Sequence, residues 1–215
     1  MQKQNFYSLS FQELKNFLIE KIGVENSKVK MRAQQLYKGI YQKGITSFTD
    51  LTTVTLELRK QLENALSLEL PKIVKTEIAA DQTIKWLLEL NDENKNLIEV
   101  VLIPSKSHNT ICVSVQVGCA MSKNSACIHC ATGTQLLVKN LSASEIVMQM
   151  MIAKRYLNDF GDQRLLSRVV CMGSGEPLTN YKATKQFIKI LMEPEGFHMG
   201  KKSITLSTIG VPDKI

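Results

Sequence analysis

The chain has 215 residues, of which 44% are hydrophobic and 22% charged, and its formal net charge is +7. This composition excludes a wholly disordered chain and leaves room for one generous domain or two small ones. The sequence contains no apolar run of about 18 residues or more, and its N-terminus is polar, so we expect neither a membrane span nor a signal peptide. We therefore expect a cytoplasmic protein, and the basic surplus is compatible with a nucleic-acid partner.

Residues 1–70 are predicted to form a small helical module, which we interpret as an accessory domain. Ser10 followed by Glu13 is typical of a capping box, and the apolar residues after it recur at helical spacing until Gly23. Two further segments carry apolar residues on one helical face, 31–42 and 56–66. The pattern predicts a three-helix core.

From about residue 73 the apolar pattern changes to one typical of strands. Segments rich in Ile, Val and Thr alternate with turn residues, which predicts strands joined by hairpins. The predicted strands cover 73–80, 84–90, 97–103 and 110–117. We interpret 71–110 as hairpin strands that lead into the next domain.

After Gly118 the pattern becomes an alternation of helices and strands. Ser142 and Glu145 predict a capped helix, and the segment GSGEP predicts a turn between a strand and a helix. The later elements are expected at 168–172, 181–192 and 203–207. This alternation is typical of βα units in a parallel sheet or barrel. We expect an α/β fold in which residues 111–215 form a partial (βα) barrel that ends early, in mid-domain.

Three cysteines lie in one predicted loop, within the segment VGCAMSKNSACIHCATG. Cys127 and Cys130 are separated by two residues, a spacing that lets two thiolates reach one metal. With Cys119 they could hold a 4Fe–4S cluster whose fourth iron stays open to a ligand with an amine and a carboxylate, such as S-adenosylmethionine (SAM). If Cys112 joined as a fourth thiolate, the set would suit a structural zinc ion instead. His129 could also join this set, although a histidine between two ligands is more often a spectator.

The segments around this loop resemble those of a known enzyme family. The matching phrases are CVSVQVGCAM at 112–121, ACIHCATG at 126–133, MRAQQLYKGIYQKGITSFTDLT at 31–52, IEVVLIP at 98–104, MGSGEPLTN at 172–180 and ITLSTIG at 204–210. They occur in family order over essentially the whole chain. The sequence therefore resembles the N-terminal portion of the RlmN-type and Cfr-type radical SAM rRNA adenine methyltransferases.

The resemblance implies a reaction, cofactors and partners. Members of the family methylate carbon 2 of an adenine in 23S rRNA and in certain tRNAs, using SAM and a 4Fe–4S cluster. One SAM methylates a cysteine near the C-terminus, and a second SAM supplies the radical that activates this methyl group. The electron for this step would come from a donor such as a flavodoxin. By resemblance, the helical module would help to grip structured RNA, with phosphate contacts expected from Lys28, Lys30, Arg32, Lys38 and Lys43.

The resemblance also implies roles for the cysteines and for one carboxylate. Cys119, Cys127 and Cys130 would be the cluster ligands. Cys112 matches the cysteine that resolves the protein–RNA adduct, and Glu99 matches the proposed acceptor of a proton from adenine. From alternation with its apolar neighbours alone, Glu99 is predicted to be a solvent-facing strand residue rather than a catalytic one.

Three further residues match family positions that hold SAM: Gly175, Glu176 and Ser207. Glu176 could accept hydrogen bonds from the SAM ammonium group, or it could cap the next helix. We interpret Cys171 as a buried packing residue.

Two departures from the family pattern bear on activity. Residues 122–125 are an insertion in the cysteine loop, and no counterpart of the methyl-carrying cysteine is present before Ile215. We therefore expect the chain alone not to methylate RNA. The alternatives for such a chain are an RNA-binding relic of the family or a zinc-binding module.

Overall fold

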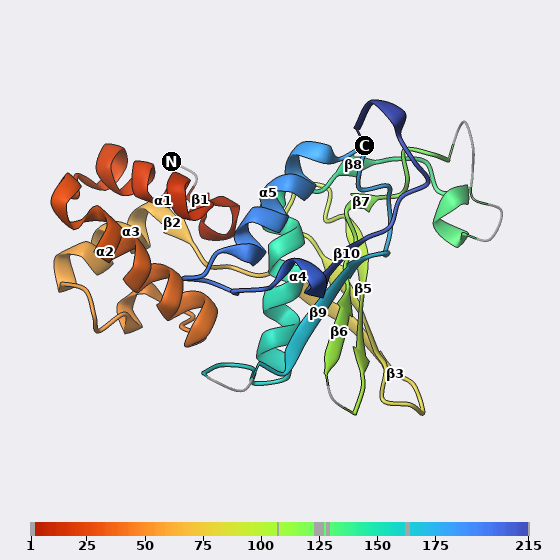
Figure 1. Ribbon diagram of the computed structural model, residues 1–215, viewed down its shortest axis with the longest axis horizontal. Coiled ribbons are helices and arrows are strands. Elements are labelled where there is room, and N and C mark those ends of the chain that lie inside the picture. The colour runs from red at the N-terminus through yellow and green to blue at the C-terminus, as the bar shows by residue number, and fades with distance from the viewer. Residues whose placement is uncertain (1–2, 107, 123–126, 128–129, 162–163, 215) are drawn as a thin grey trace.

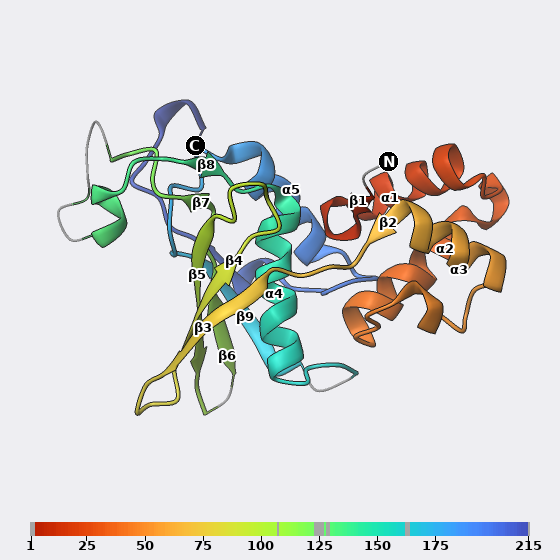
Figure 2. The same ribbon diagram turned by 180° about the vertical axis from the view of Figure 1, so that it is seen from behind.

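The structure is a computed structural model and describes residues 3–106, 108–122, 127, 130–161 and 164–214. Helices from the N-terminal part lie at one end of the molecule, two long helices lie in the middle, and a β-sheet lies beyond them (Figure 1). The short 3-10 helix Ala131–Thr134, which follows the three cysteines, lies on the far side of the sheet, away from the N-terminal helices (Figures 1 and 2). Within the described ranges, no helix is long and apolar enough to cross a membrane.

The three predicted N-terminal helices are present, although the second begins at Asn26, five residues before its predicted start at 31. The Ser10–Glu13 capping box is present at the start of α1 (Phe11–Phe17), and a π-helical turn then runs to Gly23, which has a φ of 81°. The other helices of this part are α2 (Asn26–Tyr37), its π-helical continuation (Lys38–Gln42) and α3 (Leu56–Ala65). The segment before α1 pairs with the segment after α3 as two short parallel strands, β1 (Gln4–Asn5) and β2 (Leu66–Ser67).

An aromatic cluster fills the core of this part. Phe6, Tyr7, Tyr37 and Tyr41 are all fully buried. Tyr37 and Tyr41 meet edge to face with their ring centroids 5.0 Å apart, a favoured aromatic geometry. The Tyr37 hydroxyl donates a hydrogen bond to the carbonyl of Leu9, so this buried polar group has a partner.

The central sheet has six strands in the order β10-β9-β6-β5-β4-β3. Three neighbouring pairs, from β3 to β6, are antiparallel, whereas β6, β9 and β10 run parallel. The strands are β3 (Lys72–Ile78), β4 (Ile84–Glu89), β5 (Leu97–Pro104), β6 (Asn109–Cys112), β9 (Leu166–Cys171) and β10 (Ile204–Leu206). The sheet is open, with β10 and β3 at its edges, so the expected α/β class is confirmed and the described residues form no closed barrel. The division into domains at residues 70 and 110 stays a prediction.

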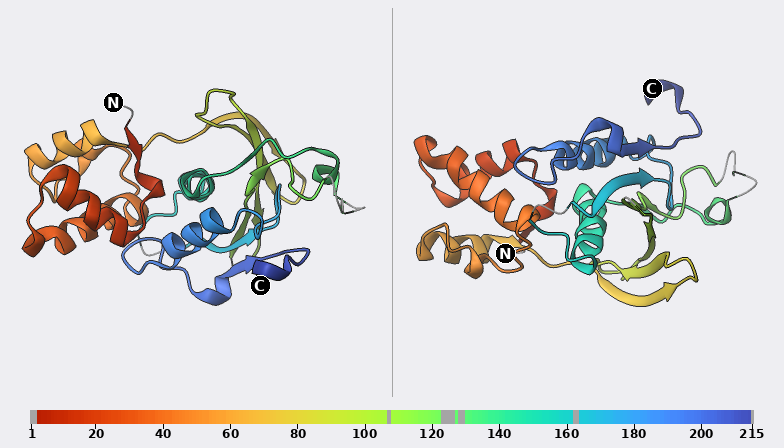
Figure 3. Two further views of the ribbon diagram at one scale, coloured as in Figure 1. Left: turned by 90° about the horizontal axis from the view of Figure 1, so that it is seen from above. Right: turned by 60° about the horizontal axis from the view of Figure 1, so that its bottom comes forward.

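The two faces of the sheet differ in what covers them. Helices α4 (Ala143–Tyr156) and α5 (Tyr181–Met192) lie along one face, between the sheet and the N-terminal helices (Figure 3). Alternate residues such as Trp86 and Val100 are buried there, at 1% and 0% exposure. The opposite face is open, and it carries the exposed side chain of Glu99. An enzyme of this architecture can use the open face and the strand ends for a site.

The predicted strand over 110–117 is wrong in one respect, because it is broken in two. β6 ends at Cys112, and a second short strand, β7 (Gln116–Val117), pairs with β8 (Lys139–Asn140) in a separate sheet. Between them, the backbone N–H and C=O of Ser114 bond the side chain of Gln149 on α4, at 2.8 and 2.9 Å. At Ser114 the Gln149 side chain therefore takes the hydrogen bonds that a neighbouring strand would otherwise make, and the strand ends before it.

Candidate active site at the carboxyl ends of the strands

Several of the predicted site residues lie where three parallel strands end. Cys112 is the last residue of β6, Cys171 is the last of β9 and Leu206 is the last of β10. The register pairs Cys112 with Val170, and Cys171 with Leu206, so these ends lie side by side. The GSGEP turn follows β9 and Ser207 follows β10, both at this edge. In open α/β sheets this edge is where ligands bind.

Glu99 and Cys112 lie on neighbouring strands and share the open face. The register pairs Cys112 with Val101, two residues from Glu99 along β5. The Glu99 side chain is 56% exposed and forms an ion pair with Lys85 at 3.4 Å. Burial raises the pKa of the Cys112 thiol, although a backbone hydrogen bond from Met172 opposes the rise. The thiol is therefore held in its protonated form at neutral pH.

The GSGEP turn has a backbone that requires glycine at one position. Gly175 has a φ of 101°, in the region that disfavours other residues. A Cβ on Gly175 would lie 2.5 Å from the Cβ of Gln116. The turn is also hydrogen bonded to the chain beside it, since Val115 donates its N–H to the Ser174 carbonyl at 2.8 Å. The turn is thus packed tightly against the segment that leads into the cysteine loop.

The carboxylate of Glu176 is buried, with 4% of the residue exposed, and it is hydrogen bonded within the chain. One oxygen accepts from Leu178 N and from the Thr208 hydroxyl at 2.8 and 2.7 Å, and the other accepts from Ile209 N at 3.0 Å. Glu176 therefore ties the turn to the segment after β10. The alternative that it caps the next helix is wrong, because Asn180 is the N-cap residue of α5. Its contact with SAM stays a prediction, as does that of the exposed Ser207.

The cysteine loop is anchored at its start and exposed further on. Cys119 is half-buried and its N–H donates to the carbonyl of Gln135 at 3.2 Å. Cys127 and Cys130 are exposed, and Cys130 N donates to the Cys127 carbonyl at 2.9 Å. Three inserted residues, 123–125, and His129 lie outside the described residues. The described part of the loop is therefore limited to residues 119–122, 127 and the segment from Cys130 onward.

The cysteines suit a metal cluster by their chemistry. All five cysteines of the chain are free thiols, so none of the three in the loop is taken by a disulfide. Among the residues that the structure describes, no three His, Cys, Asp or Glu side chains are gathered closely enough to hold a metal ion. The donor types and their number fit a site-differentiated iron–sulfur cluster. Binding one would require the exposed part of the loop to bring its two thiols toward Cys119.

Sequence reasoning missed two buried polar residues at this edge. Gln116 is fully buried and Asn180 is 7% exposed. The Asn180 amide donates to the carbonyls of Val115 and Leu141 at 2.8 and 2.7 Å, which joins two segments that flank the cysteine loop. Both residues belong to phrases that matched the family, QVGC and EPLTN, but no local periodicity marks a buried amide. Cys171 is 3% exposed, which confirms its interpretation as a packing residue, and burial raises its pKa to about 12.

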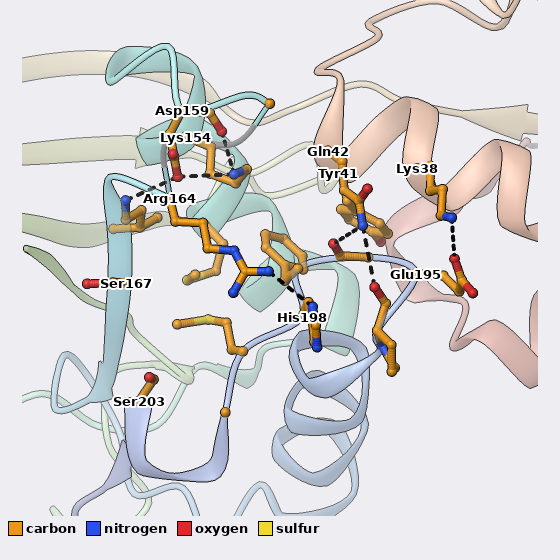
Figure 4. A pocket seen from close by; sticks show the side chains of 18 residues that line it. Lys38, Tyr41, Gln42, Lys154, Asp159, Arg164, Ser167, Glu195, His198 and Ser203 are labelled. Atoms are coloured by element: carbon orange, nitrogen blue, oxygen red, sulfur yellow. Dashed lines mark hydrogen bonds and ion pairs between the residues drawn. The ribbon is translucent and has the colours of Figure 1, made fainter.

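A cavity of about 710 Å³ lies away from this edge, where the N-terminal helices meet the start of β9. Its polar side chains are mostly paired with one another (Figure 4): Lys38 with Glu195 at 3.1 Å, and Lys154 with Asp159 at 3.1 Å. Arg164 contacts the ring of His198 at 3.2 Å. None of the residues predicted to hold the cluster or SAM, or to act on the adenine, lines the cavity, which opens near the opposite ends of the strands.

Comparison with known proteins gives one matching family model and many related sequences. Residues 4–68 match the family described as the ribosomal RNA large subunit methyltransferase N-terminal domain. The chain is 42% identical over 204 residues to the dual-specificity RNA methyltransferase RlmN of Rhodopseudomonas palustris (strain BisB18), covering 90% of this chain and 50% of that protein. It is 38% identical over 221 residues to RlmN of Dinoroseobacter shibae, covering 99% and 54%. The chain spans about half the length of the curated relatives it matches.

A solved structure shares the fold. The crystal structure of a radical SAM methyltransferase from Sphaerobacter thermophilus superposes with a TM-score of 0.82 at 35% identity. The match covers 97% of this chain and 57% of that one. The similarity therefore includes both the N-terminal helices and the open sheet.

Proposed function

We propose that this chain, a relative of the RlmN-type radical SAM RNA methyltransferases, supplies the cluster-binding and SAM-binding part of such an enzyme. One observation carries the proposal. The start of the cysteine loop at Cys119 and Ala120, the GSGEP turn, Cys112 and Ser207 lie at the carboxyl edge of the parallel strands β6, β9 and β10. Ligand sites of parallel α/β proteins are built at this edge.

In this proposal the chain's own residues hold the cofactors. Cys119, Cys127 and Cys130 would ligate a 4Fe–4S cluster. When bound and reduced by a donor such as a flavodoxin, the cluster would supply the electron that cleaves SAM. Gly175 and Glu176 would contact the methionine end of SAM. The Glu176 oxygen Oε2 accepts one hydrogen bond, from Ile209 N, so it could accept another from the SAM ammonium group.

The proposed substrate is an adenine in 23S rRNA or tRNA, methylated at carbon 2 in the cytoplasm. Glu99 would accept the proton from the adenine, since it lies on the open face with its carboxylate beside the Lys85 ammonium. Cys112 would provide a protonated thiol on the same face. The N-terminal helices would contact RNA phosphates through lysines, of which Lys38 already contacts a carboxylate.

Anaerobic reconstitution with iron and sulfide tests the metal site. We expect about four irons and four sulfides per chain, with a spin-resonance spectrum that changes on addition of SAM. Alanine in place of Cys127 or Cys130 should abolish the cluster, whereas Cys112→Ala should retain it. A chain that binds no iron under these conditions would contradict the proposal. Zinc binding that is lost in Cys112→Ala would instead favour a four-thiolate zinc site.

RNA binding without metal is a second candidate function, favoured by the match of residues 4–68 to an rRNA methyltransferase domain. Aromatic side chains of this part pack on one another, such as Tyr37 on Phe6 and on Tyr41. Binding of a 23S rRNA fragment to the metal-free chain, measured at several salt concentrations, tests it. Phosphate contacts by these helices predict that the affinity of the native chain for RNA falls as salt is added. They also predict a lower affinity at low salt when Lys30, Lys38 and Lys43 are changed to Gln.

A further inference from the structure

Gln116 joins two of the segments that form the candidate site. It is fully buried, at the start of β7. Its side-chain oxygen accepts hydrogen bonds from Ala120 N at 3.1 Å and from Glu176 N at 3.0 Å. Ala120 follows Cys119 in the cysteine loop, and Glu176 belongs to the GSGEP turn. One oxygen atom therefore holds a peptide group from each segment.

The other end of the Gln116 amide is also fixed. Its nitrogen donates to the side-chain oxygen Oδ1 of Asn140 at 2.6 Å and to the Thr179 hydroxyl at 3.0 Å. These bonds orient the amide, because only one of its two ends can donate. Gly175 then packs directly on the Gln116 side chain, where a Cβ would be 2.5 Å away. Hydrogen bonds at both ends of the amide and the packing of Gly175 therefore fix the position of the Gln116 side-chain oxygen.

We propose that Gln116 is a positioning residue that sets the distance between the cysteine loop and the GSGEP turn. This inference rests on the proposed function, in which SAM must reach an iron of the cluster and the turn at the same time. Such a ligand binds only if the two halves of its site keep their separation to within a fraction of an ångström. Gln116 touches neither cofactor in this role; it acts through the peptide after Cys119 and the peptide before Glu176.

Gln149 offers a matched control for this role. It is also a fully buried glutamine whose amide bonds two backbone groups of a neighbouring segment, both of Ser114. It does not bond the cysteine loop or the turn in the described part of the chain. Gln116→Met and Gln149→Met remove the same amide from equally buried positions, while the flexible methionine keeps a similar length. A purely structural role would make their effects alike.

The first test uses the chain without cofactors and measures hydrogen exchange of single amides by NMR. In Gln116→Met we expect Ala120 and Glu176 both to exchange at least about tenfold faster, because each loses a hydrogen bond in a buried setting. Gln149→Met should leave these two amides within about twofold of the native rate and expose Ser114 instead. Gln116→Glu keeps the accepting oxygen and should protect both amides. If Gln116→Met fails to fold, Gln116→Asn, whose shorter amide reaches less far, should show the same paired loss.

The second test uses the reconstituted chain and measures iron content together with SAM affinity from the spin-resonance change. Gln116→Met should keep most of the iron but bind SAM at least about tenfold more weakly, whereas Gln149→Met should bind SAM normally. Equal effects of the two substitutions on SAM, or exposure of only one of the two amides, would overturn the inference. A native chain that binds no cluster but shows the paired exchange would refute the proposed function and leave the coupling by Gln116 established.

Discussion

Cys112 and Glu99 lie on the same face of the sheet, on adjacent strands, because Cys112 pairs with Val101 and Glu99 is two residues from Val101 along β5. Side chains two residues apart on a strand point to the same side. That face is the one that α4 and α5 leave open (Figure 3). The two residues are thus placed where one bound base could meet both, although they are 13 positions apart in the sequence.

The thiols are expected to react with iodoacetamide in a set order. Cys127 and Cys130 are exposed, Cys112 is half-buried with a raised pKa, and Cys171 is 3% exposed with a pKa of about 12. Because the thiolate is the reactive form, Cys127 and Cys130 should be labelled first at pH 7.5, Cys112 later and Cys171 last. Peptide mass spectrometry over a time course measures this order. The urea-unfolded chain is the control, in which the differences should largely disappear; early labelling of Cys171 would contradict the packing described.

Gly175→Ala should destabilise the chain much more than Gly23→Ala. Both glycines have positive φ, at 101° and 81°, but a Cβ on Gly175 overlaps Gln116, whereas one on Gly23 meets nothing within 4 Å. Backbone strain should cost about 1–2 kcal/mol at either site, and overpacking should add about 1–3 kcal/mol at Gly175 alone. Urea unfolding of the two variants measures the difference. Equal losses would mean that the turn can move away from Gln116.

Glu176→Gln should lower the free energy of unfolding by about 1.5–3 kcal/mol, because hydrogen bonds to a buried carboxylate are stronger than those to a neutral amide. The amide keeps one accepting oxygen but places an N–H donor where Ile209 N or Leu178 N now donates. Thr208→Val, which removes one of the bonds, should cost only about 0.5–1.5 kcal/mol. Denaturant titration of both variants tests the ranking. A Glu176→Gln variant as stable as the native chain would show that the carboxylate is free to serve a ligand.

Local signals in the sequence predicted the elements well where the structure depends on neighbouring residues. The capping boxes at Ser10 and Ser142 are both present, and the helix predicted over 181–192 has those bounds. These features depend on residues three or four positions apart, so a single segment contains the information.

Features that depend on distant residues could not be predicted in this way. The break after Cys112 requires Gln149, 35 positions beyond Ser114, and the bond from Thr208 to Glu176 spans 32 positions. Gln116 acquires its role only when the turn at Gly175 folds against it. Motif resemblance selected residues that lie at one edge of the sheet, whereas the contacts that fix that edge come from long-range hydrogen bonds.

The pH dependence of stability should report on Asp92, which anchors the end of the cysteine-loop region through Lys139 at 2.9 Å. Burial opposes its ionisation, but hydrogen bonds from Asn96 and Lys139 outweigh this effect and lower its pKa from 3.8 to about 2. A carboxyl with a lowered folded-state pKa stabilises the fold above its unfolded pKa, and this contribution disappears as the pH falls through the folded value. The stability advantage of the native chain over Asp92→Asn should therefore be full above about pH 4 and shrink between pH 4 and 2.

Urea unfolding at several pH values measures the Asp92 effect as a difference between the two chains, so other titrating groups cancel. Asn96→Ala supplies the control, because it removes the side-chain hydrogen bond to Asp92 at 2.8 Å while leaving the backbone bond from Asn96 N at 2.9 Å and the ion pair with Lys139. It should reduce the pH-dependent part of the difference without abolishing it. If the difference in free energy of unfolding between the native chain and Asp92→Asn stayed constant from pH 6 to 2, Asp92 would have the same pKa in the folded and unfolded chains. The ion pair with Lys139 would then not stabilise the fold.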